Sequence, residues 1–415
     1  MSTTRYRALP GHWRTAVSIV AFGAVALCAA RTFNVDIVSA EYLAGTHFFY
    51  LIAALLLPLV FILFPSSKAA VAVTLVDLTL ATATGAVLLF CVLRANDIYE
   101  EGWEFAAPAY GIAVAMLAWV LLLEIGRRCG GWPVFWVAFC LSLYPLVAAV
   151  LPTVVDGLSY DFFTTVAFHL YSAESFQGVP LRAFVDWAVG YLVLGAVLQV
   201  TGGGDFFLNL TFALLGKTRG GPAKVSILAS GLMGSMSGSV VSNVLTTGAL
   251  TVPTMRRAGF SRTYAAGIEA CASTGGVLMP PIMGAAAFVM ARYLGVPYAD
   301  VAIAALIPSV LYFYGLYIQV DAYAARYELT AGVSDSVPGV TDTLLKGWDY
   351  VCTFALLIWL LLGLHWHQEA PYLAAVLLLL LRARFGLAKL SRHAVERFGL
   401  EIGTQLAELL GILAP

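Results

Sequence analysis

The sequence predicts an all-α polytopic membrane protein, and three observations support that fold class. Of the 415 residues, 60% are apolar, where a soluble domain has about 45–50%. Only 11% are charged, against about 25% in soluble proteins, and the mean hydropathy is +0.87. The formal net charge of −1 provides no basic field for a nucleic acid. Disordered proteins, nucleic-acid binders and ordinary cytosolic enzymes are therefore excluded.

Apolar runs near the length that crosses a bilayer, roughly 20 residues, recur along the chain. Each is predicted to be a helix, because a lone helix satisfies its own backbone hydrogen bonds in lipid. About ten such transmembrane helices are expected, at residues 15–30, 48–64, 70–93, 106–125, 132–151, 183–200, 263–293, 299–320, 348–364 and 370–383.

The basic residues orient these spans, since Lys and Arg concentrate in cytoplasmic loops. A cytoplasmic N-terminus and ten crossings leave all but four of the 23 basic residues on the cytoplasmic side. The four exceptions are Arg31, Arg94, Arg182 and Arg292. The distribution favours this topology.

The stretch 225–253 fits no simple crossing. Its sequence, VSILASGLMGSMSGSVVSNVLTTGALTVP, has basic residues before it (Lys217, Arg219, Lys224) and after it (Arg256, Arg257). One crossing would move one of these clusters outside. A re-entrant hairpin that enters and leaves from the cytoplasm is predicted instead, with its polar tip covered by protein or a watery cavity. The alternative is a spanning helix packed through small residues.

The next run, 263–293, is predicted to be a broken helix. It contains ASTGGVLMPP, and the pairs Gly275–Gly276 and Pro280–Pro281 cannot continue a helix without loss of hydrogen bonds. A proline kink without functional meaning is the alternative.

A polar hairpin beside an unwound helix at mid-membrane is a recurrent device of transporters. Hydroxyl, amide and carbonyl oxygens can replace the water around Na⁺, and the N-termini of half-helices attract carboxylates. The predicted binding residues are Ser239, Ser242, Asn243, Thr246 and Thr247 of the hairpin, and Gly275, Gly276 and Met279 of the broken helix. A Na⁺ site is predicted at Ser239, Asn243, Gly275 and Gly276, with no catalytic residue and no organic cofactor.

Three further carboxylates lie in or beside apolar runs, where an ionisable residue suggests a function. Glu124 is close to Arg127 and Arg128, so an ion pair is favoured. For Asp77 a contact between helices is favoured over a role in transport. Proton coupling through Glu269, which precedes the predicted break, stays open.

Two segments are predicted to lie along the bilayer as interfacial arms, because polar and apolar residues alternate in them at helical spacing. They are 205–216 and 385–412. The stretch 328–347 is predicted to be a polar linker on the cytoplasmic side.

The region GKTRGGPAKVSILASGLMGSMSGSVVSNVLTTGALTVPTMRRAGF…EACASTGGVLMPPIMGAAAF resembles the large membrane subunit of tripartite ATP-independent periplasmic (TRAP) transporters. The SGS-x-x-x-N-x-x-T-T-G and STGG-x-x-MPP-x-MGAAAF motifs look most like the subclass that works with TAXI-type binding proteins. The resemblance covers about 130–325. It implies that 1–130 is a fused small-subunit-like domain of four helices, and that 131–415 is the first half of a large-subunit-like transport and scaffold domain.

The resemblance also implies a function. A TAXI-type periplasmic solute-binding protein would deliver an organic acid to a permease in the bacterial inner membrane, and a Na⁺ gradient would drive its uptake. Ser239, Asn243 and Thr247 would match hairpin positions near Na⁺ and substrate, while Gly275, Gly276 and Pro280 would match the broken helix.

The family carries two inverted repeats, each with a hairpin and a broken helix, whereas this sequence shows one of each. We therefore expect a truncated form, or one half of a split pair that works with a chain carrying the second repeat. Two alternatives to a transport component are a membrane enzyme acting on lipids, for which the sequence shows no interfacial catalytic cluster, and a structural or regulatory subunit that does not transport.

Overall fold

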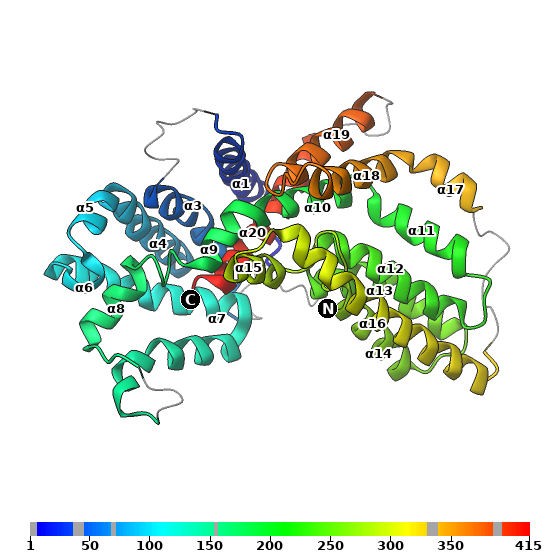
Figure 1. Ribbon diagram of the computed structural model, residues 1–415, viewed down its shortest axis with the longest axis horizontal. Coiled ribbons are helices and arrows are strands. Elements are labelled where there is room, and N and C mark those ends of the chain that lie inside the picture. Colours follow the sequence, from blue (N-terminus) through cyan, green and yellow to red (C-terminus); the bar gives the residue numbers. More distant parts are fainter. Residues whose placement is uncertain (1–5, 36–44, 68–71, 153–156, 330–338, 385–391) are drawn as a thin grey trace. The chain divides into compact units, whose positions relative to one another are not determined.

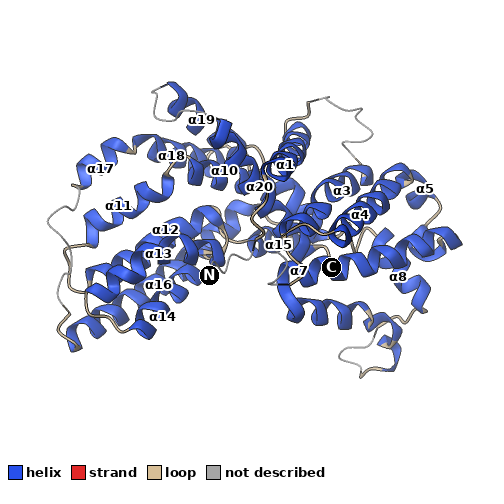
Figure 2. Ribbon diagram, turned by 180° about the vertical axis from the view of Figure 1, so that it is seen from behind, coloured by secondary structure: helices blue, strands red, loops and turns tan. Residues whose placement is uncertain are grey.

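The computed structural model describes residues 6–35, 45–67, 72–152, 157–329, 339–384 and 392–415, except for the side chains of Ser237, Ser242 and residues 392–394. Within these ranges the chain is helical and has no strand (Figure 2), which confirms the predicted all-α class. The chain forms two compact units. Unit 1 comprises Met1–Val189 and Val395–Pro415, and unit 2 comprises Gly190–Ala394.

Unit 1 is a helical bundle around α3. Its elements are α1 (Gly11–Thr32), α3 (Thr46–Leu63), α4 (Leu75–Leu93), α5 (Ala95–Glu100), α6 (Trp103–Ala106), α7 (Ala109–Ser142), the 3₁₀ turns η1 (Tyr144–Leu146) and η2 (Ala148–Val150), α8 (Phe162–Tyr171), α9 (Val179–Ala183), the π-helical turn η3 (Phe184–Ala188) and α20 (Arg392–Leu413), which enters unit 1 from Val395. Helix α3 packs along α4 and also contacts α1 and α7 (Figure 1). Its side chains Tyr50, Ile52, Leu56 and Val60 are fully buried, as expected of an apolar helix with neighbours on several sides.

A buried cluster of charges joins three parts of unit 1. The carboxylate of Asp77 accepts a hydrogen bond from Arg7 at 2.9 Å and one from Arg128 at 2.7 Å, and all three side chains are about 1% exposed. Asp77 also closes a capping box with Thr74 at the start of α4. The interpretation of Asp77 as a contact between helices is therefore confirmed.

The predicted ion pair of Glu124 is confirmed as well. Its two oxygens accept hydrogen bonds from Arg127 at 2.6 Å, and one of them accepts a further bond from Arg128 at 2.9 Å. Three guanidinium groups, those of Arg7, Arg127 and Arg128, thus meet two carboxylates at one end of the bundle.

Helix α7 is interrupted within its length. Gly131 has φ 77° and ψ −174°, which no residue in a continuous helix adopts, and Pro133 follows in the next turn. The helical part after this break ends at Ser142, before the span predicted at 132–151 is complete, and two 3₁₀ turns continue from there. The domain boundary predicted at residue 130 stays a prediction, and it falls one residue before this break.

Helix α20 corresponds to the arm predicted at 385–412, of which 385–391 lie outside the described residues. Its residues Ile402, Leu406, Ala407 and Leu410 are fully buried. Its glycines allow close packing: a Cβ on Gly403 would lie 2.9 Å from Val17 of α1, and a Cβ on Gly411 would lie 2.6 Å from Cys129 of α7. The sequence predicted that this helix lies along the bilayer as an interfacial arm, whereas in the structure its apolar residues pack against other helices of unit 1.

Unit 2 contains α10 (Val189–Val200), α11 (Gly203–Leu215), α12 (Gly221–Ser237), α13 (Val240–Arg257), α14 (Arg262–Gly276), α15 (Ala285–Leu294), α16 (Tyr298–Arg326), α17 (Val340–Lys346), α18 (Trp348–Leu362) and α19 (Ala370–Arg384). Helices α12, α13 and α14 all pack on one another, and α16 packs on α12 and α14 (Figure 1). Helices α18 and α19 form a second pair, and α11, the arm predicted at 205–216, packs on α12 and α17.

Among the described residues, six helices are long and apolar enough to cross a membrane. The bent pair of α17 and α18, whose axes differ by 72°, would make a seventh. The chain is thus a polytopic membrane protein by helix length and composition, while the predicted count of about ten spans is not confirmed.

Candidate functional site

The chain turns back on itself between α12 and α13. Helix α12 ends with Gly238 as its C-cap, in the left-handed conformation at φ 60°, which glycine adopts without the steric cost of a Cβ. Helix α13 begins two residues later and packs against α12. The hairpin predicted at 225–253 is therefore present as two helices joined by a tight turn.

The break predicted in 263–293 is also present. Helix α14 ends at Gly276 and α15 begins at Ala285, so the sequence VLMPPIMG between them is not helical. The hydroxyl of Tyr298 in α16 donates a hydrogen bond to the backbone oxygen of Pro281 at 2.9 Å and one to that of Ile282. This contact holds the unwound segment against the next helix.

The tip of the hairpin lies against this unwound segment. A Cβ on Gly238 would lie 2.7 Å from the carbonyl oxygen of Met283. One turn earlier, a Cβ on Gly234 would lie 2.4 Å from the Cα of Gly276. No side chain fits between the two backbones at either place, so glycine is what allows the hairpin and the broken helix to touch.

Asn243 lies buried at this contact. It is 2% exposed, and its Nδ2 donates a hydrogen bond to the backbone oxygen of Ser230 at 2.8 Å. A Cβ on Gly276 would lie 3.1 Å from the same Nδ2 atom. Its Oδ1 atom is buried and has no hydrogen-bond partner within the described part of the chain. An unpaired buried acceptor costs about 1–3 kcal/mol, which is the cost that a bound cation or water would remove.

The other predicted residues lie in different surroundings. Gly275 is buried near the end of α14, where a Cβ would collide with Tyr312 of α16. Met279 and Pro280 are half-buried in the unwound segment, and Ser239 is half-buried at the tip. Thr246 is exposed. The side chain of Ser242 lies outside the described residues.

Thr247 is buried and belongs to a cluster around Glu269. Glu269 is 1% exposed, and five hydroxyl groups donate hydrogen bonds to its carboxyl group. They come from Ser226 at 2.7 Å, Ser230 at 3.1 Å, Thr251 at 2.5 Å and Ser273 at 3.2 Å, and from Thr247. We call these six residues the Glu269 cluster.

The sequence analysis singled out Glu269 and Thr247 but missed the other four members. A signal was present, because the cluster is built from pairs four residues apart: Ser226 with Ser230, Thr247 with Thr251, and Glu269 with Ser273. Residues at this spacing share one face of a helix. Three such faces, on α12, α13 and α14, meet at the carboxyl group.

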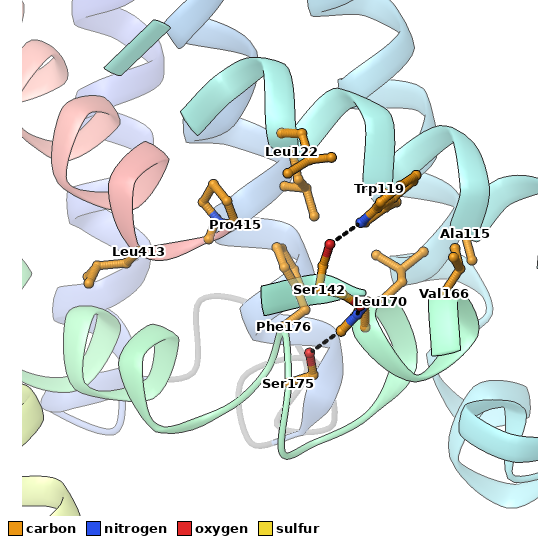
Figure 3. Close-up of a pocket in the computed structure, with 13 residues that line it drawn as sticks. Ala115, Trp119, Leu122, Ser142, Val166, Leu170, Ser175, Phe176, Leu413 and Pro415 are labelled. Atoms are coloured by element: carbon orange, nitrogen blue, oxygen red, sulfur yellow. Dashed lines mark hydrogen bonds between the residues drawn. The ribbon is translucent and has the colours of Figure 1, made fainter. Parts of the chain in front are cut away.

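A separate cavity lies in unit 1, with a volume of about 180 Å³. Its polar groups bond to one another: Trp119 donates to the hydroxyl of Ser142 at 3.1 Å, and His169 lies 3.4 Å from the hydroxyl of Ser175 (Figure 3). The rest of its wall is mostly apolar, with Leu122, Leu170 and Phe176. Small-molecule sites usually measure about 300–1,000 Å³, so the hairpin is the stronger candidate.

A hairpin whose tip meets an unwound helix, within a bundle of apolar helices, is the architecture of secondary transporters. The comparison with known families gives the particular family. The model of the DctM component of tripartite ATP-independent periplasmic transporters matches residues 117–415, and the chain belongs to this family. This is a family of multi-pass transporters of the inner membrane and not of enzymes, as the sequence predicted.

Curated relatives match shorter stretches. The sialic acid TRAP transporter permease SiaT of Haemophilus influenzae is 29% identical over 54% of this chain and 32% of its own length. The 2,3-diketo-L-gulonate TRAP transporter large permease YiaN of Escherichia coli is 30% identical over 43% of this chain and 34% of its own. The C4-dicarboxylate TRAP transporter large permease DctM of Pseudomonas aeruginosa is 28% identical over 37% of each. The matched region thus spans about a third of these relatives.

Proposed function

We propose that the chain is a permease component of a Na⁺-driven TRAP-type uptake system for an organic acid. A TAXI-type periplasmic binding protein would deliver the solute, and the N-terminus would face the cytoplasm. One observation carries the proposal: the tip of the hairpin meets the unwound segment of the broken helix, and a buried oxygen without a partner in the described structure lies beside the contact. The names of the three relatives, which refer to sialic acid, a gulonate and C4-dicarboxylates, support an organic acid as the solute class.

The C-terminal ends of two helices meet at this contact, and they favour the binding of a cation there. Helices α12 and α14 both end there, and their Gly234 and Gly276 touch. The last carbonyl oxygens of a helix carry its negative dipole end. Among the described residues, the oxygen of Gly276 accepts a hydrogen bond from the N–H group of Met279, whereas that of Gly275 accepts from the N–H groups of both Leu278 and Val277. Together with Asn243 and Ser239, they form the hard-oxygen set that suits Na⁺.

The helix starts favour an anion. Helix α13 begins just after Gly238 and α15 just after Gly284, and a Cβ on Gly284 would lie 3.6 Å from the oxygen of Gly238. The first turns of these two helices therefore lie close together. Such N-termini attract a carboxylate without a basic side chain, which is how we propose that the substrate is held.

Asn243→Ala tests the cation site. In the purified chain in lipid nanodiscs, we expect saturable binding of radioactive sodium, and we expect the variant to weaken it about tenfold or more, since one lost ligand of about 1.4 kcal/mol has that effect. Thr254→Ala is the matched control, because the hydroxyl of this half-buried threonine of α13 donates to Leu250 of its own helix. Wild-type binding by Asn243→Ala, in a variant whose melting temperature shows that it is folded, would refute the site.

The topology of the hairpin has its own test. Because α13 runs back along α12, the exposed residues Lys217 and Arg257 are expected to face the same aqueous compartment. In a background without the six cysteines, Lys217→Cys and Arg257→Cys should react with an impermeant thiol reagent from the same side. His365→Cys lies between the spans predicted at 348–364 and 370–383, in a loop that the predicted topology places outside. It should react from the opposite side of the membrane. Labelling of 217 and 257 from opposite sides would show a plain crossing.

A further inference from the structure

The Glu269 cluster is a built site that the proposed Na⁺ and substrate sites do not use. Its carboxyl group is buried between three helices and bonded to hydroxyl groups alone among the described residues. A carboxylate inside an apolar bundle is costly unless its charge is compensated. Elsewhere in this chain the compensation comes from guanidinium groups, as Arg7 and Arg128 show at Asp77.

Charged groups do occur on the helices packed around the cluster, but they bond elsewhere or lie near helix ends. Lys224 of α12 donates to Asp321 of α16 at 2.6 Å, and Arg219 pairs with the same carboxylate. Within the described part of the chain, the hydrogen-bond partners of Glu269 do not include the other charged residues on these elements, which are Lys224 on α12, Arg256 and Arg257 on α13, Arg262 on α14, Asp300, Asp321 and Arg326 on α16, and Asp205 on α11.

Hydroxyl groups differ from guanidinium groups in one decisive respect. A guanidinium only donates hydrogen bonds and therefore fixes a carboxylate in its ionised form, whereas a hydroxyl both donates and accepts. Five hydroxyls can donate to an ionised carboxylate, and one of them can reverse to accept from a protonated carboxyl group. The cluster can thus satisfy Glu269 in both states, which a group that takes up and releases protons requires.

The distances within the cluster are those of hydrogen bonds. The carboxyl oxygens lie 2.5–3.2 Å from four of their hydroxyl partners, and Ser230 lies 3.2 Å from Thr247. The protons of the hydroxyl groups account for these contacts with an ionised carboxylate. A proton added to Glu269 would use the same pairs of oxygens, because a hydroxyl can also accept from a protonated carboxyl group.

We propose that Glu269 with its five hydroxyl partners is a proton-binding site within the hairpin and broken-helix assembly. Uptake of a proton from water forms an O–H bond on one carboxyl oxygen and leaves the other as a carbonyl oxygen; release returns the proton to water. The cluster also contacts Asn243: Ser230 accepts from its Nδ2 through the backbone oxygen and donates to Glu269 through its hydroxyl. A role of this proton in transport rests on the proposed function. Proton binding at Glu269 does not depend on it.

Infrared difference spectroscopy of the purified full chain in lipid tests proton binding directly. Between neutral and acidic buffer, we expect a C=O band of a protonated carboxyl group that Glu269→Gln loses. Glu124→Gln is the matched control, because Arg127 and Arg128 hold that carboxylate ionised, and the band should remain. Identical difference spectra of the wild type and Glu269→Gln would overturn the proposal. Loss of sodium binding in Glu269→Gln without any such band would overturn it in favour of a metal ion.

A second measurement keeps the proposal testable if Glu269→Gln does not fold. Thr251→Val removes one donor to the ionised form and keeps the side-chain shape, so the midpoint pH of the band should rise by about one unit. Thr254→Ala, one turn away with its hydroxyl bonded to Leu250, should leave the midpoint unchanged. An unchanged midpoint in Thr251→Val would count against the proposal that the hydroxyl groups of the Glu269 cluster stabilise the ionised carboxylate. If the band titrates as expected but uptake ignores pH, the proton site stands and its role in transport fails.

Discussion

Gly276→Ala should separate the broken helix from the hairpin and destabilise unit 2 by about 1–3 kcal/mol or more, the range for overpacked interiors. The added Cβ would lie 2.8 Å from the Cα of Gly234 and 2.8 Å from the backbone oxygen of Ser230. Both are main-chain atoms, so no side chain can rotate away. We expect a lower melting temperature of the purified chain and a loss of sodium binding, because the Na⁺ site needs both helix ends in contact.

Gly267→Ala is the matched control on the same helix. A Cβ there meets no heavy atom within 4 Å, and alanine favours helix more than glycine does by about 1 kcal/mol. The control should therefore melt at the same or a higher temperature. Equal melting and equal sodium binding of Gly276→Ala and Gly267→Ala would show that the hairpin and the broken helix do not depend on this backbone contact.

Asp77→Ala should lower the stability of unit 1 more than the other variants proposed for that unit. It leaves the guanidinium group of Arg7, about 1% exposed, buried without its carboxylate partner, and that of Arg128, equally buried, with Glu124 as its remaining carboxylate partner. Removing one partner of a buried ion pair typically costs about 3–5 kcal/mol. We expect this loss in the free energy of unfolding, measured by titration with a denaturing detergent, together with a lower yield of folded protein.

Asp97→Ala provides the comparison. Asp97 also pairs with an arginine, Arg94, but both side chains are exposed, at 38% and 52%. Exposed pairs contribute little to stability, so this variant should unfold as the wild type does. If Asp77→Ala were equally harmless, the cluster around Asp77 would not stabilise unit 1, and its arginines would have to find other partners at no cost.

The hairpin and the break were predictable from sequence because both depend on local backbone chemistry. Gly238 at the turn and the Gly–Gly and Pro–Pro pairs at and after the end of α14 disfavour the continuation of a helix. The sequence also placed the ends of α1, α3 and α4 within a few residues, but not those of α7, which continues past the predicted end at 125 and finishes at Ser142. Asn243 and Gly276 were chosen for their polarity and flexibility, and the structure places them at one contact. Their role in binding stays a proposal.

The Glu269 cluster and the burial of α20 could not be predicted in the same way. Both depend on which helix faces meet, and hydropathy does not encode that. Ser226, Thr251 and Ser273 read as ordinary small residues of packed helices until three faces converge on one carboxyl group. Likewise, the amphipathic pattern of α20 suits a membrane surface as well as a groove between α1 and α7. The count of spans stayed open because α7 breaks at Gly131 and α18 and α19 are short.

The packing of α20 into unit 1 has a consequence for biosynthesis. The first 189 residues emerge from the ribosome before the segment 395–415 that completes the same bundle, and more than two hundred residues of unit 2 intervene. Val17 and Cys129 contact the glycines of α20. While unit 2 inserts, these side chains therefore face lipid or a membrane chaperone instead of α20. The bundle closes only after unit 2 has been made, so a nascent chain halted before residue 395 would expose an apolar groove that quality-control proteases can recognise.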